Sequence, residues 1–289
     1  MSDLRFIDLH THTTASDGSD APAELVALAA RAKLAAIAIT DHDTVDGLDD
    51  ASEAGRKLGM EVIRGCELAV SSEYGEIHIL GLWIPEHAAP LTAKLQELRG
   101  YRSERNVRIV DRLCEIGLAL SYDEVVALSG GISVGRPHIA RAMVNRGYVP
   151  SVADAFTRYL GPDGEAFVPK TILSPQEGVA LLANLGATVS LAHPMLMRCP
   201  QEWLEDLVAD LGAVGLDAIE AYHSEHSQLH ERYCVELAAR HGMVLTGGSD
   251  YHGLAKPAIS IGRGRGGLRV TTHVLEQLKR LRGRKGLPC

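Results

Sequence analysis

The chain has 289 residues, of which 46% are hydrophobic and 23% charged, and its formal net charge is −8 at pH 7. This length is enough for one large core, with or without an inserted subdomain. The acidic balance argues against charge-driven binding to duplex nucleic acid, which requires a basic surface. It is compatible with a small anionic substrate, because bound divalent metal ions reverse the sign of the local potential.

Neither the cysteines nor the hydrophobic segments point to export or to a membrane. The five cysteines form no CxxC pair and no regular framework, which favours reduced thiols. No charged N-terminal region followed by an apolar one is visible, and no run reaches the roughly 18 apolar residues of a membrane span. We therefore expect a cytoplasmic protein with no membrane partner, and the sequence gives no indication of its oligomeric state.

Short apolar strands alternate with helical patterns along most of the chain. Strands are expected at 6–9, 35–40, 61–66, 77–84, 188–192, 216–221 and 243–247, and helices at 22–33, 45–58, 174–185, 200–211 and 227–241. Such alternation predicts a parallel sheet, either open or closed into a barrel. A (β/α) barrel is favoured because acids and histidines follow the predicted strand ends, where such barrels hold their active sites.

One stretch interrupts this alternation. Residues 93–170 show no convincing strand, and helices are expected there at 95–116, 122–128, 138–145 and 152–160. We interpret residues 93–170 as a helical insertion subdomain. The barrel would then consist of residues 1–92 and 171–289.

Two histidines directly follow the first predicted strand. Residues two apart in an extended chain point to the same side, so His10 and His12 can bind one metal ion together. Further acids and histidines lie at or near other predicted strands. They are Asp17, His42, Glu67, His78, His193, Asp250 and His252.

Imidazole and carboxylate ligands suit Mn, Fe or Zn, and the absence of a thiolate ligand argues against a closed structural zinc site. These candidates exceed what one ion needs, so the sequence predicts a multinuclear centre. Glu67 is the natural bridging carboxylate. Metal ions about 3.5–4 Å apart are typical of sites for in-line attack on phosphorus.

These motifs resemble the polymerase and histidinol phosphatase (PHP) superfamily. The matching segments are 8–12, 16–18, 40–43, 65–67, 192–194 and 248–252, together with His78. The resemblance implies a distorted seven-stranded (β/α) barrel of PHP type with three divalent metal ions, Mn being favoured over Fe or Zn. By position, His10, His12, Glu67 and Asp250 would bind the first ion, Glu67, His78 and His193 the second, and Asp17, His42 and His252 the third.

The segments 135–141, 159–161, 167–170 and 219–227 resemble the stand-alone PHP phosphoesterases of bacteria. Members of that branch hydrolyse nucleoside 3′,5′-bisphosphates to the 5′-mononucleotide and phosphate, and some trim short oligoribonucleotides from the 5′ end. The resemblance therefore implies a small phosphorylated nucleotide or a short RNA end as the substrate. It favours His226 over His223 as the site histidine and leaves the role of His223 open.

A substrate with two phosphates needs a second cationic group beyond the metals. Arg136 offers a planar fork suited to phosphate oxygens, on a turn that opens a helix. We expect His138 and Lys170 to contribute to the same binding site, although from its chemistry alone Arg136 could equally cap a helix or form a salt bridge. Asp250 is expected to take part in catalysis, and His193 or His226 to protonate the leaving ribose oxygen.

Other functions remain open at this stage. The alternatives are a different phosphomonoesterase such as a histidinol-phosphatase-like enzyme, an amidohydrolase of related architecture, and a non-catalytic metal-binding PHP module. The stretch 263–285 holds eight Lys or Arg residues against one acid. It is interpreted either as the solvated end of a terminal helix or as an electrostatic guide for RNA.

Overall fold

A computed structural model of the chain describes residues 5–128 and 134–289. The chain forms two compact units. The first contains the residues up to Thr92 together with Leu173–Cys289, and the second is Ala93–Ile172. We refer to them as the barrel and the insertion.

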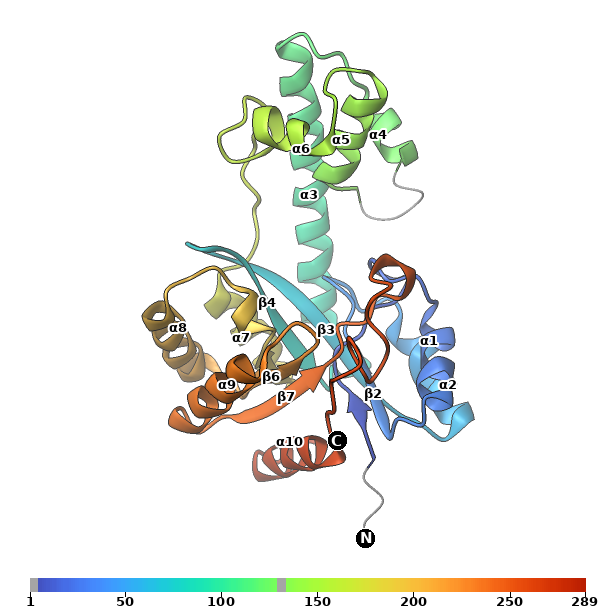
Figure 1. The fold of residues 1–289 in the computed structure, drawn as a ribbon, viewed down its shortest axis with the longest axis vertical. Coiled ribbons are helices and arrows are strands. Elements are labelled where there is room, and N and C mark those ends of the chain that lie inside the picture. The colour runs from blue at the N-terminus through green and yellow to red at the C-terminus, as the bar shows by residue number, and fades with distance from the viewer. Residues whose placement is uncertain (1–4, 129–133) are drawn as a thin grey trace. The chain divides into compact units, whose positions relative to one another are not determined.

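The barrel is built on a seven-stranded sheet whose strand order follows the sequence (Figure 1). The strands are β1 (Ile7–Asp8), β2 (Ala36–Ile39), β3 (Glu61–Ser72), β4 (Gly75–Leu82), β5 (Thr188–Leu191), β6 (Ala218–His223) and β7 (Val244–Gly248). The backbone N–H of Leu9 donates to the carbonyl oxygen of Gly247, and that of Asp250 donates to the carbonyl oxygen of His10. These bonds join the last strand to the first, and they confirm the predicted distorted barrel.

Strand direction departs from the expected parallel sheet at one strand. β4 is antiparallel to both β3 and β5, whereas the other pairs are parallel. The prediction of an all-parallel sheet was wrong here because β3 and β4 form a hairpin, and such a short connection forces antiparallel pairing. The hairpin places His78 directly opposite Ala69, two residues beyond Glu67.

Helices accompany the strands of the barrel and confirm the predicted alternation. They are α1 (Pro22–Arg31), α2 (Leu48–Leu58), α7 (Pro175–Ala183), α8 (Gln201–Val214), α9 (Gln228–Arg240) and α10 (Thr272–Arg284), with short 3₁₀ turns η2 (Pro194–Leu196) and η3 (Gly253–Ala255). Figure 1 shows α8 and α9 on one side of the strands and α1 and α2 on the other. The faces that meet the strands are apolar: Leu25, Val26 and Ala29 of α1 are buried, as are Ile37 and Ile39 of β2.

The regular elements of the insertion are all helices among its described residues. Its elements are α3 (Ala89–Glu115), which begins just before the insertion, α4 (Tyr122–Leu128), α5 (Arg136–Asn145), α6 (Val152–Ala155) and the π-helical turn η1 (Phe156–Leu160). They enclose a core of their own that includes Ile109, Leu113, Ile139 and Met143. No helix in the described parts of the chain is both long and apolar enough to cross a membrane.

Candidate metal centre

Backbone pairing brings the predicted ligands into register. The segment after β1 pairs with the segment after β7, where His12 N–H donates to the carbonyl oxygen of Tyr251 at 2.9 Å. Thr11 and Tyr251 form a parallel bridge, and so do His42 and Glu67. Ligands that are far apart in sequence therefore converge at the carboxyl ends of the parallel strands, as expected for a (β/α) barrel.

Glu67 lies at the centre of the cluster, and its side chain is buried. Both of its carboxylate oxygens contact imidazole nitrogens. Oε2 lies 3.2 Å from His10 Nε2, 3.2 Å from His12 Nε2 and 3.0 Å from His42 Nδ1, and Oε1 lies 2.9 Å from His78 Nδ1 and 3.0 Å from His193 Nε2. The two oxygens thus face different histidines, as a carboxylate that bridges two metal ions requires.

Asp250 divides its two oxygens in a similar way. Oδ1 lies 3.3 Å from His12 Nε2 and 3.6 Å from His10 Nε2, on the side of the buried ligands. Oδ2 lies 2.6 Å from Lys256 Nζ and 3.5 Å from His223 Nε2. One oxygen therefore remains available to a metal ion while the other is held by a cation.

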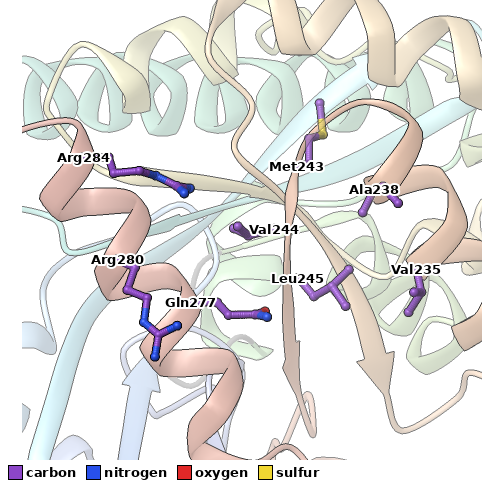
Figure 2. Close-up of a pocket in the computed structure, with 9 residues that line it drawn as sticks. Val235, Ala238, Met243, Val244, Leu245, Gln277, Arg280 and Arg284 are labelled. Atoms are coloured by element: carbon purple, nitrogen blue, oxygen red, sulfur yellow. The ribbon is translucent and has the colours of Figure 1, made fainter.

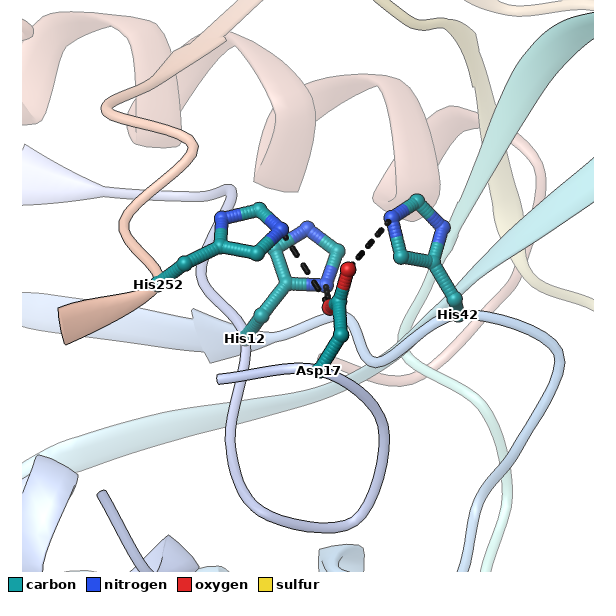
Figure 3. A group of neighbouring side chains, drawn as sticks. All are labelled: His12, Asp17, His42 and His252. Atoms are coloured by element: carbon teal, nitrogen blue, oxygen red, sulfur yellow. Dashed lines mark ion pairs between the residues drawn. The ribbon is translucent and has the colours of Figure 1, made fainter. Parts of the chain in front are cut away.

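Asp17 forms an outer group with three histidines (Figure 3). Its Oδ1 lies 3.3 Å from His252 Nε2 and 3.7 Å from His12 Nδ1, and its Oδ2 lies 3.9 Å from His42 Nε2. The loop that carries Asp17 is fastened by Asp41, which accepts hydrogen bonds from Thr13 N–H at 2.7 Å and from Ser16 Oγ at 2.6 Å. The half-exposed Asp17 carboxylate is in this way held at the rim of the cluster.

The geometry of these atoms fits divalent cations. His10 Nε2, both ring nitrogens of His12 and Glu67 Oε2 are buried without a hydrogen-bond partner, which is costly unless another group satisfies them. Two atoms that bind one metal at about 2.1 Å lie roughly 3.0–3.4 Å apart at octahedral to tetrahedral angles. The contacts around Glu67 have this spacing. Three overlapping groups could each hold an ion: His10, His12 and Glu67; His42, Glu67 and His78; and His12, Asp17, His42 and His252.

Charge within the cluster is balanced between carboxylates and imidazoles. Burial raises the pKa of Glu67, but His42, His10 and His78 outweigh it and hold the pKa well below its ordinary value. Burial lowers the pKa of His78 and His12, and the neighbouring carboxylates reverse this, raising it to about 10 and about 9 respectively. In His42 burial prevails and lowers the pKa to about 3. Protons on His12 and His78 thus supply the positive charge that bound metal ions would otherwise provide.

Two of the predicted ligands have an unusual backbone. Asp250 has φ 56° and His193 has φ 28°, in the left-handed region that residues other than glycine rarely adopt. Both are restrained by hydrogen bonds from their own N–H groups, to the His10 carbonyl for Asp250 and to Glu220 Oε2 at 2.8 Å for His193. Strain of this kind persists where the surrounding structure fixes it, and it is concentrated at functional sites.

Two buried acids that support the ligands were missed in the sequence. Glu220 Oε1 lies 3.0 Å from His10 Nδ1, and its other oxygen accepts the bond from His193. Asp8 accepts hydrogen bonds from Ser249 N–H, Ser249 Oγ and Gly262 N–H, which fixes the backbone next to Asp250. Their signal is visible in retrospect, because each is a carboxylate inside an otherwise apolar strand. Such outer partners orient metal ligands.

The two histidines after β6 have different surroundings. His223 is buried, its Nε2 has no hydrogen-bond partner, and it lies beside Asp250. His226 is half-buried, and its Nδ1 lies 2.9 Å from the carbonyl oxygen of Ala221. Its ring contacts His223 and His230, and burial lowers its pKa to about 4. The structure therefore places His223 against the ligands, and the role expected for His226 stays a prediction.

The predicted phosphate-binding residues have local contacts within the insertion. Arg136 donates to the carbonyl oxygen of Leu160 at 3.0 Å, and its guanidinium lies 5.6 Å from the centroid of the Phe156 ring. His138 Nδ1 accepts a hydrogen bond from Gly135 N–H at the start of α5. Lys170 is half-buried in the segment that leaves the insertion. Their part in substrate binding stays a prediction.

A cavity of about 370 Å³ lies in the barrel away from the candidate ligands, between α9, β7 and α10 (Figure 2). Among the described residues its lining contains none of the candidate ligands. It is mainly apolar and is bordered by Gln277, Arg280 and Arg284 of α10. Other basic residues near the C-terminus fasten this helix: buried Arg282 donates to the carbonyl oxygens of Pro288 and Gly186. This favours a structural role for the stretch over guidance of RNA.

Comparison with known proteins identifies the family. A family model described as the PHP domain matches residues 8–161, more than half of the chain. The chain belongs to the PHP family. The membership expected from the motifs is thereby confirmed, and the matched region begins at Asp8 and includes His10, His12 and Glu67.

Three curated PHP relatives match most of this chain. It is 34% identical over 245 residues to a 5′-3′ exoribonuclease of Haemophilus influenzae, covering 85% of this chain and 89% of that protein. It is 33% identical over 251 residues to a phosphoribosyl 1,2-cyclic phosphate 1,2-diphosphodiesterase of Eggerthella lenta, covering 85% and 94%. It is 32% identical over 248 residues to a 3′,5′-nucleoside bisphosphate phosphatase of Chromobacterium violaceum, covering 85% and 87%.

A solved structure has the same fold. It is a protein of Bifidobacterium adolescentis described as a candidate metal-dependent phosphoesterase, with a TM-score of 0.74 and 31% identity. The match covers 96% of this chain and 96% of that protein. The PHP barrel and its insertion are therefore shared over nearly the whole length.

Proposed function

We propose that the protein is a metal-dependent phosphoesterase that removes the 3′-phosphate of nucleoside 3′,5′-bisphosphates and also acts on short oligoribonucleotides from the 5′ end. The observation that carries this proposal is the division of the Glu67 oxygens between two sets of histidines. It is the arrangement that adjacent metal ions need, and multinuclear centres of this kind suit phosphoryl transfer. The exoribonuclease and bisphosphate phosphatase among the relatives support the substrate class.

The proposed centre holds three divalent ions, with Mn favoured. Glu67, His10, His12 and Asp250 would bind the first, Glu67, His78 and His193 the second, and Asp17, His42 and His252 the third. When bound, such ions supply Lewis acidity to the phosphate oxygens and to a nucleophilic water. Glu67 contacts His10, His12, His78 and His193, Asp250 contacts His12, and Asp17 contacts His42 and His252, and these contacts support the assignment.

The protein's own residues orient the ligands and move the proton. Glu220 fixes the ring of His10 and the backbone of His193, so that both side chains have a defined direction. Water attacks phosphorus, the bond to the 3′-oxygen breaks, and that oxygen must gain a proton. The candidate donors are His193, His226 and, because of its contact with Asp250, His223.

A substrate panel tests the proposal. Adenosine 3′,5′-bisphosphate, AMP, a short 5′-phosphorylated RNA and phosphoribosyl 1,2-cyclic phosphate are compared with added Mn²⁺ and after chelation. We expect phosphate release from the bisphosphate with AMP as the product, cleavage of the RNA to 5′-mononucleotides, and loss of both activities on chelation. Turnover of the cyclic phosphate alone would instead indicate the activity named for the Eggerthella lenta relative. No turnover of any compound by metal-loaded protein would reject the proposal.

A further inference from the structure

A cavity of about 300 Å³ lies in the barrel directly beside Asp250. It is formed by the segment after β6, the end of the β7 segment and the chain that follows η3. Its lining includes His223, Asp250, Lys256, Ala258, Ile259 and Arg265. A volume of this size is at the lower end for small-ligand sites.

The cavity has two cationic side chains. Lys256 Nζ lies 2.6 Å from Asp250 Oδ2, and Arg265 is paired with Glu225 at 2.8 Å. An ammonium group has three N–H donors, and Asp250 is the described partner of Lys256. If Asp250 also held a metal ion, that ion would neutralise part of the negative charge that Asp250 shares with Lys256. Lys256 would then offer unused donors and positive charge to the cavity.

The remaining walls suit a sugar. His223 Nε2 is buried 3.5 Å from Asp250 Oδ2 and has no hydrogen-bond partner, so a ligand hydroxyl beside Asp250 could satisfy it. Ala258 and Ile259 supply apolar surface beside it. Glu225 and Asp250 line the cavity beside the two cations they pair with. The N–H donors that Lys256 and Arg265 retain, together with the apolar wall, suit a phosphorylated ribose.

We propose that this cavity receives the nucleotide that follows the scissile phosphate in an oligoribonucleotide, an inference that rests on the proposed function. The terminal phosphate of a bisphosphate has nothing attached beyond it, so its hydrolysis requires no further space. A phosphodiester continues past the phosphorus, and the continuing nucleotide needs a site next to the ligands. Water adds to phosphorus, the bond to the 3′-oxygen of the first nucleotide breaks and that oxygen takes the proton. The phosphate stays on the second nucleotide.

The test compares the dinucleotide pApA with adenosine 3′,5′-bisphosphate in the parent protein and in two variants. Arg265→Ala removes an exposed cation of the cavity, and Ala258→Trp fills the space from an exposed position. We expect each variant to lower the ratio of kcat/KM for pApA to that for the bisphosphate by about tenfold or more. Arg263→Ala, an exposed arginine two residues away that does not line the cavity, should leave the ratio unchanged.

The outcomes separate this inference from the proposed function. Parent protein that hydrolyses the bisphosphate but not pApA would overturn the cavity's role and keep the phosphatase activity. Equal effects of Ala258→Trp and Arg265→Ala on both substrates, or no effect on either, would also overturn it. Parent protein that is inactive on both substrates would reject the proposed function itself. Metal content measured in each variant shows whether any loss comes from the metal centre.

Discussion

Glu220 connects two candidate ligands without being one itself. It lies 3.0 Å from His10 Nδ1 and accepts the N–H of the strained His193. Glu220→Gln keeps the shape of the side chain and removes its charge. We expect roughly 10- to 100-fold weaker metal binding and a similar loss of turnover, which is typical of outer-shell partners.

This prediction is checked by titrating the Glu220→Gln variant with metal against a competing chelator. Glu86→Gln, at an exposed acid, is the matched control and should bind metal as the parent does. A Glu220→Gln protein with the parent's metal affinity would show that the carboxylate does not orient the ligands.

The protons held by His12 and His78 lead to a second prediction. Their pKa values are raised to about 9 and about 10, so both imidazoles are protonated at about pH 7 in the metal-free protein. A metal ligand must be neutral, so binding has to displace these protons. We expect apparent metal affinity to rise with pH up to about those pKa values and to fall in acid.

Calorimetric titration of metal into chelated protein, in buffers of different ionisation enthalpy, measures the protons released. We expect more than one proton per protein at about pH 7 and fewer at about pH 10. A binding enthalpy that does not depend on the buffer would contradict ligation by His12 and His78.

At the scale of elements, the positions of the strand ends predicted which acids and histidines lie close together. Eight of the nine residues selected from the sequence lie in or after the strands that pair in parallel, whose carboxyl ends meet at one edge, whereas His78 lies on antiparallel β4. The direction of β4 was not predictable, because an apolar strand has the same pattern in either direction. The hairpin also explains how His78, near the middle of β4, reaches Glu67.

Supporting contacts were harder to foresee than ligands. Glu220 and Lys256 act through neighbours that are distant in sequence, and only the closed barrel shows them. His223 and His226 are three residues apart at the end of β6. The sequence resemblance favoured His226, and the structure places the His223 ring 3.5 Å from Asp250. Pattern alone could not decide between them, because the turn after the strand sets which ring points toward Asp250.

A substitution at Gly248 tests how closely the backbone of β7 approaches the segment that follows β1. A Cβ atom at this position would lie 2.3 Å from the backbone nitrogen of His10. The atoms in the way belong to His10, a candidate ligand, so the backbone there must shift to admit the methyl group. Gly248→Ala should therefore destabilise the fold by about 1–3 kcal/mol and reduce metal binding. The control Gly283→Ala, in α10 with nothing within 4 Å of the added atom, should be neutral or stabilising. Denaturant unfolding of both variants gives the comparison, and equal stabilities would contradict the close approach.

The candidate site residues are distributed over the two compact units of the molecule. The barrel contains the candidate metal ligands, and the insertion has its own core and the arginine expected to bind the second phosphate. The sequence predicted helices in the insertion from their apolar periodicity. It could not reveal that Arg136 donates to the Leu160 carbonyl and lies over Phe156. Both contacts join residues at least 20 positions apart, so they depend on the tertiary packing of the insertion.

Arg136→Ala tests whether the insertion takes part in substrate binding. A guanidinium with five donors can keep its bond to Leu160 and still bind phosphate. We expect the variant to raise KM for adenosine 3′,5′-bisphosphate by about tenfold or more while KM for an aryl phosphate, which has no second phosphate, changes little. Arg141→Ala, at an exposed arginine of the same helix, is the control. An equal rise for both substrates would mean that Arg136 only stabilises the insertion, and unfolding measurements on the same variant would then show a matching loss of stability.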